Sequence, residues 1–466
     1  MTLSSMKALC IAALLSCIAV AVASAAPAVG WRTDGTGKYL TAQPPTTWSP
    51  TQNVAWKTAM PSWGNSTPVV VGKRMFLCAE PATLLCVDTA DGKILWQKSN
   101  TYEDFAPAQA AQIKADQARG QQLQGEVWNL GNNIKKLKTA LQDKPDDADL
   151  KAKLAAAEQQ VGEKSKELDA VRKTGHLLPA SHPINGYSSA TPLTDGVRVY
   201  AVFGNGVAVA YDLYGTRLWA RPIEKSVDMW GFSTSPVIAD GKLIVHILNV
   251  SALDPATGKI LWQTRVQEAY GTPAVTKIGD ADVIITSAGS IVRAKDGVVL
   301  AQNLSRLDFA SPVVEGNTVY FIQNGGKALQ LPAQIVGDKA EVKALWETKP
   351  RNDRYYGSPV VHDGLIYACT QANAFSVIDA ATGAVVCEKI LPLGKGVCYP
   401  SVTMAGGLLY VTNDNGNTVV VKPGREFQQV AASSLEPVRS SLVAIGDALY
   451  LRGLQNLYCL RASTTP

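Results

Sequence analysis

The chain has 466 residues, of which 46% are hydrophobic and 18% are charged, with 44 basic and 39 acidic side chains. This composition supplies enough apolar material for a large core and excludes a mostly disordered chain. The net charge of +5 is small and dispersed, which argues against a nucleic-acid-binding protein.

Residues 1–25 have the pattern of a signal peptide. Lys7 supplies the positive charge, residues 8–22 are apolar, and a small-residue cleavage site ends at Ala25. We therefore expect an exported protein, periplasmic or secreted, cleaved after Ala25. The alternative is a lipoprotein anchored at Cys17, but this cysteine lies in the middle of the apolar run, which favours cleavage after Ala25.

A six-residue string, Gly-Lys-Ile-Leu-Trp-Gln, occurs at 92–97 and again at 258–263. Upstream of each copy stands a phrase of a small residue, Ser or Thr, Pro and apolar residues. This phrase recurs about every 40 residues, a period typical of propeller blades. Its proline stands at Pro68, Pro192, Pro236, Pro273, Pro312 and Pro359, and Val402 and Leu442 hold the same place in two weaker copies.

Each repeat predicts four short antiparallel strands separated by Asp-Gly and Asn-Gly turns. Eight opening phrases predict an all-β, eight-bladed β-propeller. The eighth copy ends at its third strand near Leu460, whereas Val54-Ala55-Trp56-Lys57 reads as a fourth strand without the preceding three. We expect this strand to close blade eight, with blade one in residues 26–102 and blades two to eight in residues 179–466.

The fourth strand of most repeats carries a tryptophan, and Cys387 and Ala301 replace it in two blades. Because the spacing is that of the repeat, we expect these rings to fill the wedges between blades and not to bind a cofactor. The structural tryptophans are Trp56, Trp96, Trp219, Trp262 and Trp346.

Residues 103–178 interrupt the first and second repeats with a different pattern. Apolar residues at alternating spacings of three and four predict two helices, and Pro145 followed by Asp146 and Asp147 marks the break between them. We expect an antiparallel coiled-coil hairpin with arms of roughly 40–50 Å. It should stand on the face of the propeller that carries the turns between second and third strands, as a docking arm or as a neutral insertion.

The phrase Asp-x-x-x-Gly-Lys-x-Leu-Trp, at residues 88–96 and 254–262, resembles the tryptophan-docking repeat of the PQQ-like, quinoprotein-type β-propeller superfamily. The resemblance covers nearly the whole mature chain except the insertion. The run from Trp31 to Gly37, followed by Pro44-Pro45, is similar to PQQ-like repeat proteins of planctomycete-type bacteria. Within the superfamily the chain resembles the BamB type, which implies a propeller that binds partner proteins and no quinone.

Members that use pyrroloquinoline quinone carry an adjacent pair of cysteines and acidic and Asn ligands for calcium. No two cysteines are adjacent in this chain, and residues 413–417, which resemble a calcium loop, occupy a hairpin turn. Neither a zinc or haem pattern nor a GxSxG, HExxH, P-loop or complete GxGxxG motif occurs, so we predict no catalytic residue and no metal ligand. Cys78 and Cys86, which could face each other across a hairpin, are the one disulfide worth testing.

An aromatic residue precedes most of the opening strands. Because these connections converge on the central channel, the aromatic residues and neighbouring charges form a candidate binding rim for a peptide or a sugar. The alternative is that the rings only pack between blades. The rim residues are Trp63, Tyr187, Trp230, Phe232, Tyr270, Phe309, Tyr355, Tyr356, Tyr399 and, in blade eight, Arg439.

The sequence therefore favours a non-enzymatic, exported propeller that binds or scaffolds proteins in the periplasm or cell envelope, with no cofactor. The alternative is a dehydrogenase that depends on pyrroloquinoline quinone and calcium. The sequence does not name the partner or the oligomeric state.

Overall fold

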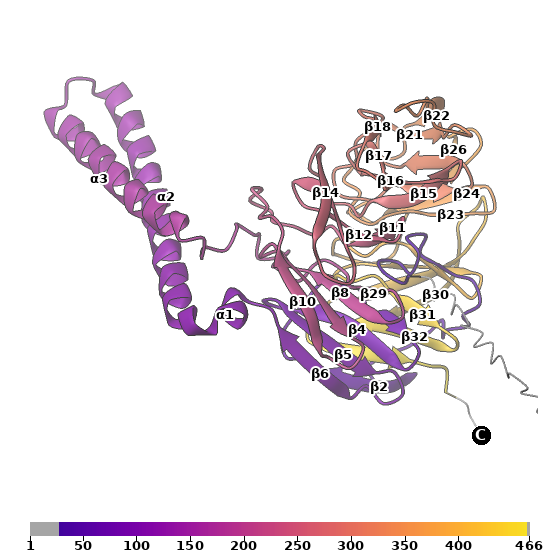
Figure 1. The fold of residues 1–466 in the computed structure, drawn as a ribbon. Coiled ribbons are helices and arrows are strands. Elements are labelled where there is room, and N and C mark those ends of the chain that lie inside the picture. The colour runs from indigo at the N-terminus through magenta and orange to yellow at the C-terminus, as the bar shows by residue number, and fades with distance from the viewer. Residues whose placement is uncertain (1–27, 464–466) are drawn as a thin grey trace, which may run out of the picture.

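The computed structural model describes residues 28–463 (Figure 1). The predicted signal peptide, with Cys10 and Cys17, lies outside these residues. The described chain is mainly β-structure. Seven of its sheets have four antiparallel strands, and one has four antiparallel strands and a fifth, parallel strand, as is consistent with a β-propeller. None of its helices is long and apolar enough to cross a membrane.

The first four sheets each take four consecutive strands. They are β3 (Val69–Val71), β4 (Arg74–Ala79), β5 (Thr83–Asp88) and β6 (Ile94–Ser99); β7 (Leu193–Thr194), β8 (Arg198–Val202), β9 (Val207–Asp212) and β10 (Arg217–Pro222); β11 (Val237–Ala239), β12 (Lys242–His246), β13 (Asn249–Leu253) and β14 (Ile260–Arg265); and β15 (Ala274–Ile278), β16 (Ala281–Ile285), β17 (Ile291–Arg293) and β18 (Val299–Ala301).

The next two sheets follow the same rule, and the last two also recruit N-terminal strands. They are β19 (Val313–Glu315), β20 (Thr318–Phe321), β21 (Gly326–Gln330) and β22 (Lys343–Thr348); β23 (Val360–His362), β24 (Leu365–Cys369), β25 (Ala374–Asp379) and β26 (Val385–Ile390); β27 (Thr403–Ala405), β28 (Leu408–Thr412), β29 (Asn417–Lys422) and β30 (Gln428–Ser434) with β1 (Lys38–Tyr39); and β31 (Val443–Ile445), β32 (Ala448–Arg452) and β33 (Asn456–Leu460) with β2 (Val54–Ala59).

The last sheet joins the two ends of the described chain. Strand β2 pairs antiparallel with β33, so that Trp56 lies opposite Cys459 and Lys57 opposite Tyr458. A second N-terminal contact is made by β1, which pairs parallel with β27. The N-terminal segment therefore covers the edge that the last sheet would otherwise expose.

Burial differs between the strands of a sheet. The second and third strands, such as β4 and β5, bury nearly every side chain, because neighbouring sheets cover both of their faces. The fourth strands β6 and β14 instead alternate between half-buried and exposed residues. The apolar core therefore lies between adjacent sheets, where the seven clusters of buried side chains are found.

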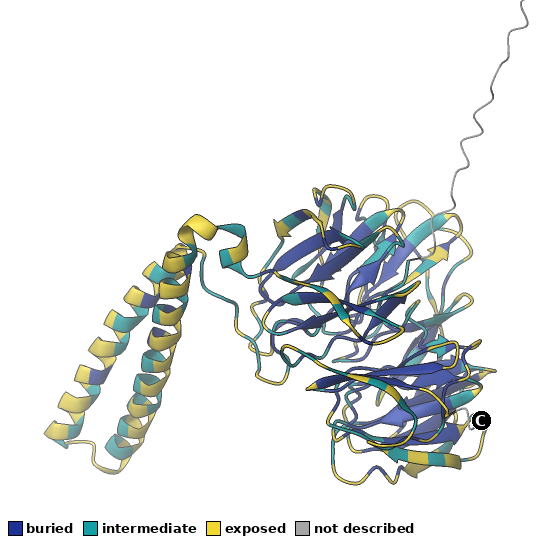
Figure 2. Ribbon diagram, turned by 90° about the horizontal axis from the view of Figure 1, so that it is seen from below, coloured by how far each residue is buried: buried dark blue, intermediate teal, exposed yellow. Residues whose placement is uncertain are grey.

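The segment between β6 and β7 is helical. It contains α1 (Tyr102–Phe105), a short 3₁₀ turn, η1 (Pro107–Gln109), and two long helices, α2 (Ala110–Asp143) and α3 (Ala148–Lys173). The long helices run side by side and project away from the sheets (Figures 1 and 2). The Asp147 carboxylate accepts hydrogen bonds from the backbone N–H groups of Asp149 and Leu150 and so caps α3.

The base of the helical segment is fixed to the second sheet. The Tyr102 hydroxyl donates to the Asn205 carbonyl at 2.6 Å. The Lys225 ammonium donates to the carbonyls of Gly175 and Leu177 at 2.8 and 2.7 Å and lies 4.8 Å from the centre of the Tyr102 ring. Both ends of the insertion therefore contact the face on which the β8–β9 turn lies.

The disulfide considered for Cys78 and Cys86 is wrong. In the β4–β5 ladder Cys78 lies opposite Leu84, and Cys86 lies opposite Phe76, so the two thiols are out of register. Both are buried and free. The two thiols that do approach each other are Cys369 and Cys398, with 3.7 Å between their Sγ atoms.

Candidate functional site

A ring of hydroxyl groups lines the centre of the molecule, where the opening strands of the sheets converge. Each hydroxyl belongs to the Ser or Thr of the repeated opening phrase and is at least nine-tenths buried. In order around the ring these residues are Thr67, Thr191, Ser235, Thr272, Ser311, Ser358, Ser401 and Ser441, called here the hydroxyl ring.

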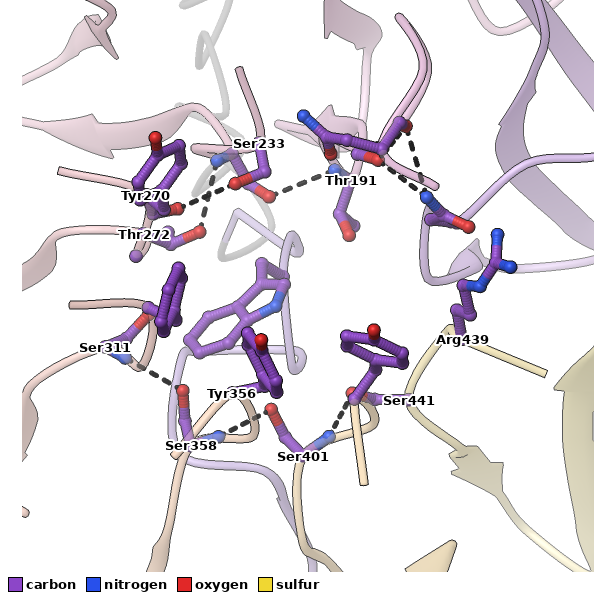
Figure 3. Close-up of a pocket in the computed structure, with 18 of the residues that line it drawn as sticks. Thr191, Ser233, Tyr270, Thr272, Ser311, Tyr356, Ser358, Ser401, Arg439 and Ser441 are labelled. Carbon is purple, nitrogen blue, oxygen red and sulfur yellow. Dashed lines mark hydrogen bonds between the residues drawn. The ribbon is translucent and has the colours of Figure 1, made fainter. Parts of the chain in front are cut away.

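Hydrogen bonds connect these residues in one direction. The backbone N–H of one donates to the hydroxyl oxygen of the next at 2.9–3.2 Å, and the bond from Ser441 to Thr67 joins the last sheet to the first. The step from Thr272 to Ser311 lacks this bond. Several of these bonds are drawn in Figure 3. Among residues 28–463 the ring hydroxyls accept these bonds but donate none, so their O–H groups are available to a ligand in the channel.

The N-terminal run closes the channel below the ring. Trp31 borders two cavities, one of about 250 Å³ that contains the hydroxyl ring and one of about 310 Å³ on the opposite side. We call them the mouth cavity and the rear cavity. Val29 bridges Thr194 in the second sheet, and β1 joins the seventh, so the run spans the channel. The mouth cavity is therefore blind.

Arg32 lies behind Trp31 and is fully buried, and no carboxylate among residues 28–463 pairs with it. Its Nη2 donates to the carbonyls of Pro359 and Val402, both at 2.9 Å, and its guanidinium carbon lies 5.2 Å from the centre of the Trp31 ring. Burial lowers the pKa of Arg32 to about 10, which leaves it charged at neutral pH. Gly37, at φ +72°, has no room for a side chain because the guanidinium lies against it.

One side of the mouth cavity is an aromatic wall. Successive rings of Tyr270, Phe309, Tyr356 and Tyr399 have centroids 5.6, 4.6 and 4.8 Å apart. These four residues come from the connections before four consecutive opening strands, and they form a continuous apolar surface. Figure 3 shows Tyr270 and Tyr356 beside the hydroxyl ring.

The other side of the cavity is polar. The Asn65 Nδ2 donates to the Ile184 carbonyl and the Ser189 hydroxyl, at 2.7 and 2.8 Å, whereas its buried Oδ1 has no partner among the described residues. Arg439 also donates to the Ile184 carbonyl, at 3.3 Å, and its buried Nε has no partner in the described part of the chain. Arg354 completes the positive groups and contacts the Tyr356 hydroxyl at 3.4 Å.

The structure divides the proposed rim into two groups. Trp230, Tyr270, Phe309, Tyr356, Tyr399 and Arg439 line the mouth cavity. Phe232 and Tyr355 are buried in the core between sheets, and the Tyr355 hydroxyl donates to the Arg351 carbonyl. Trp63 and Tyr187 are not among the described residues that line the cavity. Trp63 packs near Gly186, and the Tyr187 hydroxyl donates to the Pro179 carbonyl.

Several lining residues were not singled out from the sequence. Trp31 belongs to the run from Trp31 to Gly37, but nothing in the sequence of that run indicates that it enters the channel. His182, Ile184 and Asn185 follow the helical segment, and the His182 ring stacks on Trp230 with centroids 4.4 Å apart. The signal for the hydroxyl ring was present, because its Ser and Thr residues recur in every opening phrase.

The tryptophans assigned to blade docking all contact the next sheet. Their indole N–H groups donate at 2.9–3.2 Å to the backbone carbonyls of Thr89, Leu213, Pro255, Ala294 and Ala380, in chain order. Each ring also lies against a glycine with positive φ, so a side chain there would collide with the ring. These contacts hold neighbouring sheets together.

The residues of the mouth cavity do not fit a calcium-assisted quinone site. No Asp or Glu is among its lining residues, and calcium prefers carboxylate and carbonyl oxygens. Across residues 28–463 no group of three or more His, Cys, Asp or Glu side chains is placed to hold a metal ion. The hydroxyl ring and the arginines are donors, which suit acceptor groups of a ligand.

Four-stranded sheets that dock through repeated tryptophans around a blind channel define a PQQ-like β-propeller. The chain belongs to the family whose model is described as outer membrane protein assembly factor BamB, which matches residues 46–137, 161–306 and 300–424. A curated relative is the outer membrane protein assembly factor BamB of Moranella endobia (strain PCIT). It is 24% identical over 371 residues, which are 77% of this chain and 78% of the relative.

Two solved structures share the fold. A europium-containing methanol dehydrogenase has a TM-score of 0.55 at 11% identity, covering 92% of this chain and 90% of its own. The quinohemoprotein alcohol dehydrogenase of Comamonas testosteroni has a TM-score of 0.51 at 10% identity, covering 94% and 82%. At this identity the likeness concerns the fold alone.

Proposed function

We propose that this chain is a non-enzymatic, exported β-propeller that binds partner proteins in the periplasm or cell envelope. In this proposal the eight sheets are the eight blades of one closed ring, and α2 and α3 form a coiled-coil hairpin inserted between blades one and two. The observation that carries the proposal is the match of the BamB family model to most of the chain.

The face around the mouth cavity supports a protein partner. Next to the cavity, the loop between β10 and β11 exposes Val227, Met229 and Trp230, and Ile184 is partly exposed beside them. These four apolar residues, called here the mouth patch, lie near the base of the helical segment. Exposed apolar side chains that gather beside a cavity are typical of protein-binding surfaces.

Site-specific photo-crosslinking in cells that produce the full-length chain tests this function. A photoreactive phenylalanine analogue would replace Met229 in the mouth patch, which is 73% exposed, or Val336 on the β21–β22 loop, which is 68% exposed. We expect one envelope protein to crosslink at position 229 and not at 336. Equal crosslinking at both positions, or none at 229, would contradict the proposal.

A third crosslinking position tests the hairpin. Trp128, on α2, is 69% exposed, although tryptophan is usually more buried. Crosslinking of the same protein at 128 and 229 would assign the hairpin to the docking surface. Crosslinking at 229 alone would make it a neutral insertion.

The alternative is a dehydrogenase dependent on pyrroloquinoline quinone and calcium, and the fold of the two dehydrogenases above favours it. Purified protein would be incubated with the quinone and calcium and then assayed for dye-linked alcohol oxidation. We expect no calcium-dependent turnover, because the lining residues offer no carboxylate for the metal. Calcium-dependent oxidation of an alcohol would establish the alternative.

A further inference from the structure

We propose that the mouth cavity receives the C-terminal end of a partner polypeptide. The terminal carboxylate accepts hydrogen bonds from the hydroxyl ring, the last side chain packs on the aromatic wall, and the last backbone N–H donates to Asn65. This inference rests on the proposed function, because it names the part of the partner that enters the propeller.

The shape of the cavity requires a chain end. Trp31 separates the mouth cavity from the rear cavity, and the segment that carries it is tied to two sheets. A polypeptide entering from the mouth side cannot thread through the channel. A cavity of about 250 Å³ can hold a terminal residue with its side chain, whereas an internal segment would have to enter and turn back in the same space.

The charges of the cavity select the carboxyl end. Arg354 and Arg439 line it, and no Asp or Glu of the described chain does so. Arg32 adds a buried positive charge behind the floor. A terminal ammonium would meet three positive charges, whereas a carboxylate gains both charge attraction and the free O–H donors of the ring.

The two sides of the cavity match the two parts of a terminal residue. The aromatic wall offers an apolar surface for the side chain. On the opposite side, the unpaired Asn65 Oδ1 needs a donor, and a peptide supplies one in its last N–H. A simple aromatic acid would leave this buried acceptor without a partner, so the polar side favours a peptide.

The residues before the terminus also have a surface to contact. Trp230 belongs both to the cavity lining and to the mouth patch, so the apolar surface continues from the cavity to the outside. A partner chain that leaves the cavity in this direction crosses the patch near the base of the helical segment.

Calorimetry on the full-length protein with synthetic peptides tests the proposal. The probe is acetyl-Gly-Ser-Gly-Ser-Gly-Phe with a free carboxylate. We expect its C-terminal amide to bind at least about tenfold more weakly, and a peptide with N-methylated final Phe to bind several-fold more weakly. Replacing the final Phe by Ser should also weaken binding, because the aromatic wall loses its contact.

Protein variants locate the site. Arg439→Gln and Tyr356→Ala should each weaken binding of the free-acid peptide about three- to tenfold, with unchanged melting temperatures. The matched control is Arg425→Gln, because this exposed arginine pairs with Asp379 away from the cavity. Its affinity should equal that of the wild type.

Three results would overturn the inference: equal binding of acid and amide, no effect of the cavity variants, or binding of 3-phenylpropanoate as tight as that of the peptide. The last result would assign the cavity to small acids. If a partner still crosslinks at Met229 in the Arg439→Gln, Tyr356→Ala double variant as strongly as in the wild type, the proposed function stands and the chain-end inference fails.

Discussion

Some buried charged side chains of this molecule are not part of the repeat. Arg32 is the clearest case, because its buried guanidinium has no carboxylate partner in the described part of the chain and is held by two backbone carbonyls. Such a charge is costly to desolvate, so the effect of replacing Arg32 on the free energy of unfolding depends on the new side chain.

Two substitutions of Arg32 should therefore behave differently. Arg32→Ala leaves a cavity and two carbonyls without their donor, and we expect the free energy of unfolding to fall by about 2–4 kcal/mol. Arg32→Met fills most of the volume and removes the desolvated charge, so the loss should be about 1 kcal/mol or less. Urea denaturation of both variants measures the difference, and equal losses would contradict this explanation.

Glu80 makes stability depend on pH. Burial raises the pKa of its carboxyl from 4.5 to about 7, against the effect of hydrogen bonds from the Tyr187 and Ser188 backbone. The folded state binds this proton more tightly than the unfolded state. Glu80 therefore contributes to the free energy of unfolding below pH 4.5, and this contribution is lost as the pH rises through 7.

We expect this carboxyl to lower the free energy of unfolding by up to about 3 kcal/mol between pH 4.5 and 8. Glu80→Gln, which cannot ionise and keeps an acceptor for the backbone, should lose that part of the pH dependence. Denaturation of both proteins at several pH values is the measurement. Parallel pH profiles would show that Glu80 does not titrate in this range.

At the scale of the element, the fourth strands connect one sheet to the next. In the ladder of β13 with β14, Ala252 lies opposite Trp262, but the next residue, Leu253, lies opposite Ile260, so the register shifts beside the tryptophan. A similar irregularity recurs at the other docking tryptophans. An extra residue at this point re-aims the indole toward the neighbouring sheet.

Two substitutions of Trp219 separate the stabilisation by the aromatic ring from that by its hydrogen bond. Trp219→Phe loses the bond to the Pro255 carbonyl but keeps an aromatic ring, and we expect a loss of about 1 kcal/mol. Trp219→Ala also empties a buried wedge and should cost about 3–5 kcal/mol. Chemical denaturation distinguishes the two, and similar values would show that the ring contributes little to docking.

Lys225 anchors the chain after α3 to the loop that follows β10. Lys225→Met should remove both hydrogen bonds to the chain after α3 while the sheets keep their packing. We expect faster amide exchange over residues 174–181 and an unchanged melting temperature of the propeller. Lys173→Met, an exposed change at the end of α3, is the control, and equal exchange in both variants would contradict the anchoring role.

The repeat made most elements predictable, because the period of the opening phrase and the tryptophans reflects packing that recurs in every sheet. The cavity was less predictable. Tyr355 and Tyr356 are adjacent, and only the direction of each side chain decides that one is buried and the other lines the cavity. Trp31 was missed as its floor because it lies outside the repeat and reaches the channel through contacts with distant sheets.

At the scale of the whole molecule, the last sheet is completed by the pairing of β2 with β33. In the described sheets every other fourth strand follows its third strand directly along the chain, as β14 follows β13. Strand β2 lies at the opposite end of the described chain from β33, so only hydrogen bonds and packing hold it there. The same substitution in β2 and in β14 should therefore have different consequences.

Lys57 and Gln263 occupy equivalent positions, each directly after a docking tryptophan and opposite Tyr458 and Ser251. Proline at either position removes a backbone donor and disturbs the ladder, which should cost about 3 kcal/mol. In Gln263→Pro the strand stays beside its partner, and unfolding should remain one sharp transition. In Lys57→Pro, β2 can leave β33, so the first and last sheets can separate before the others unfold. Amides of β33 and β3–β6 should then exchange faster, and the unfolding transition should broaden.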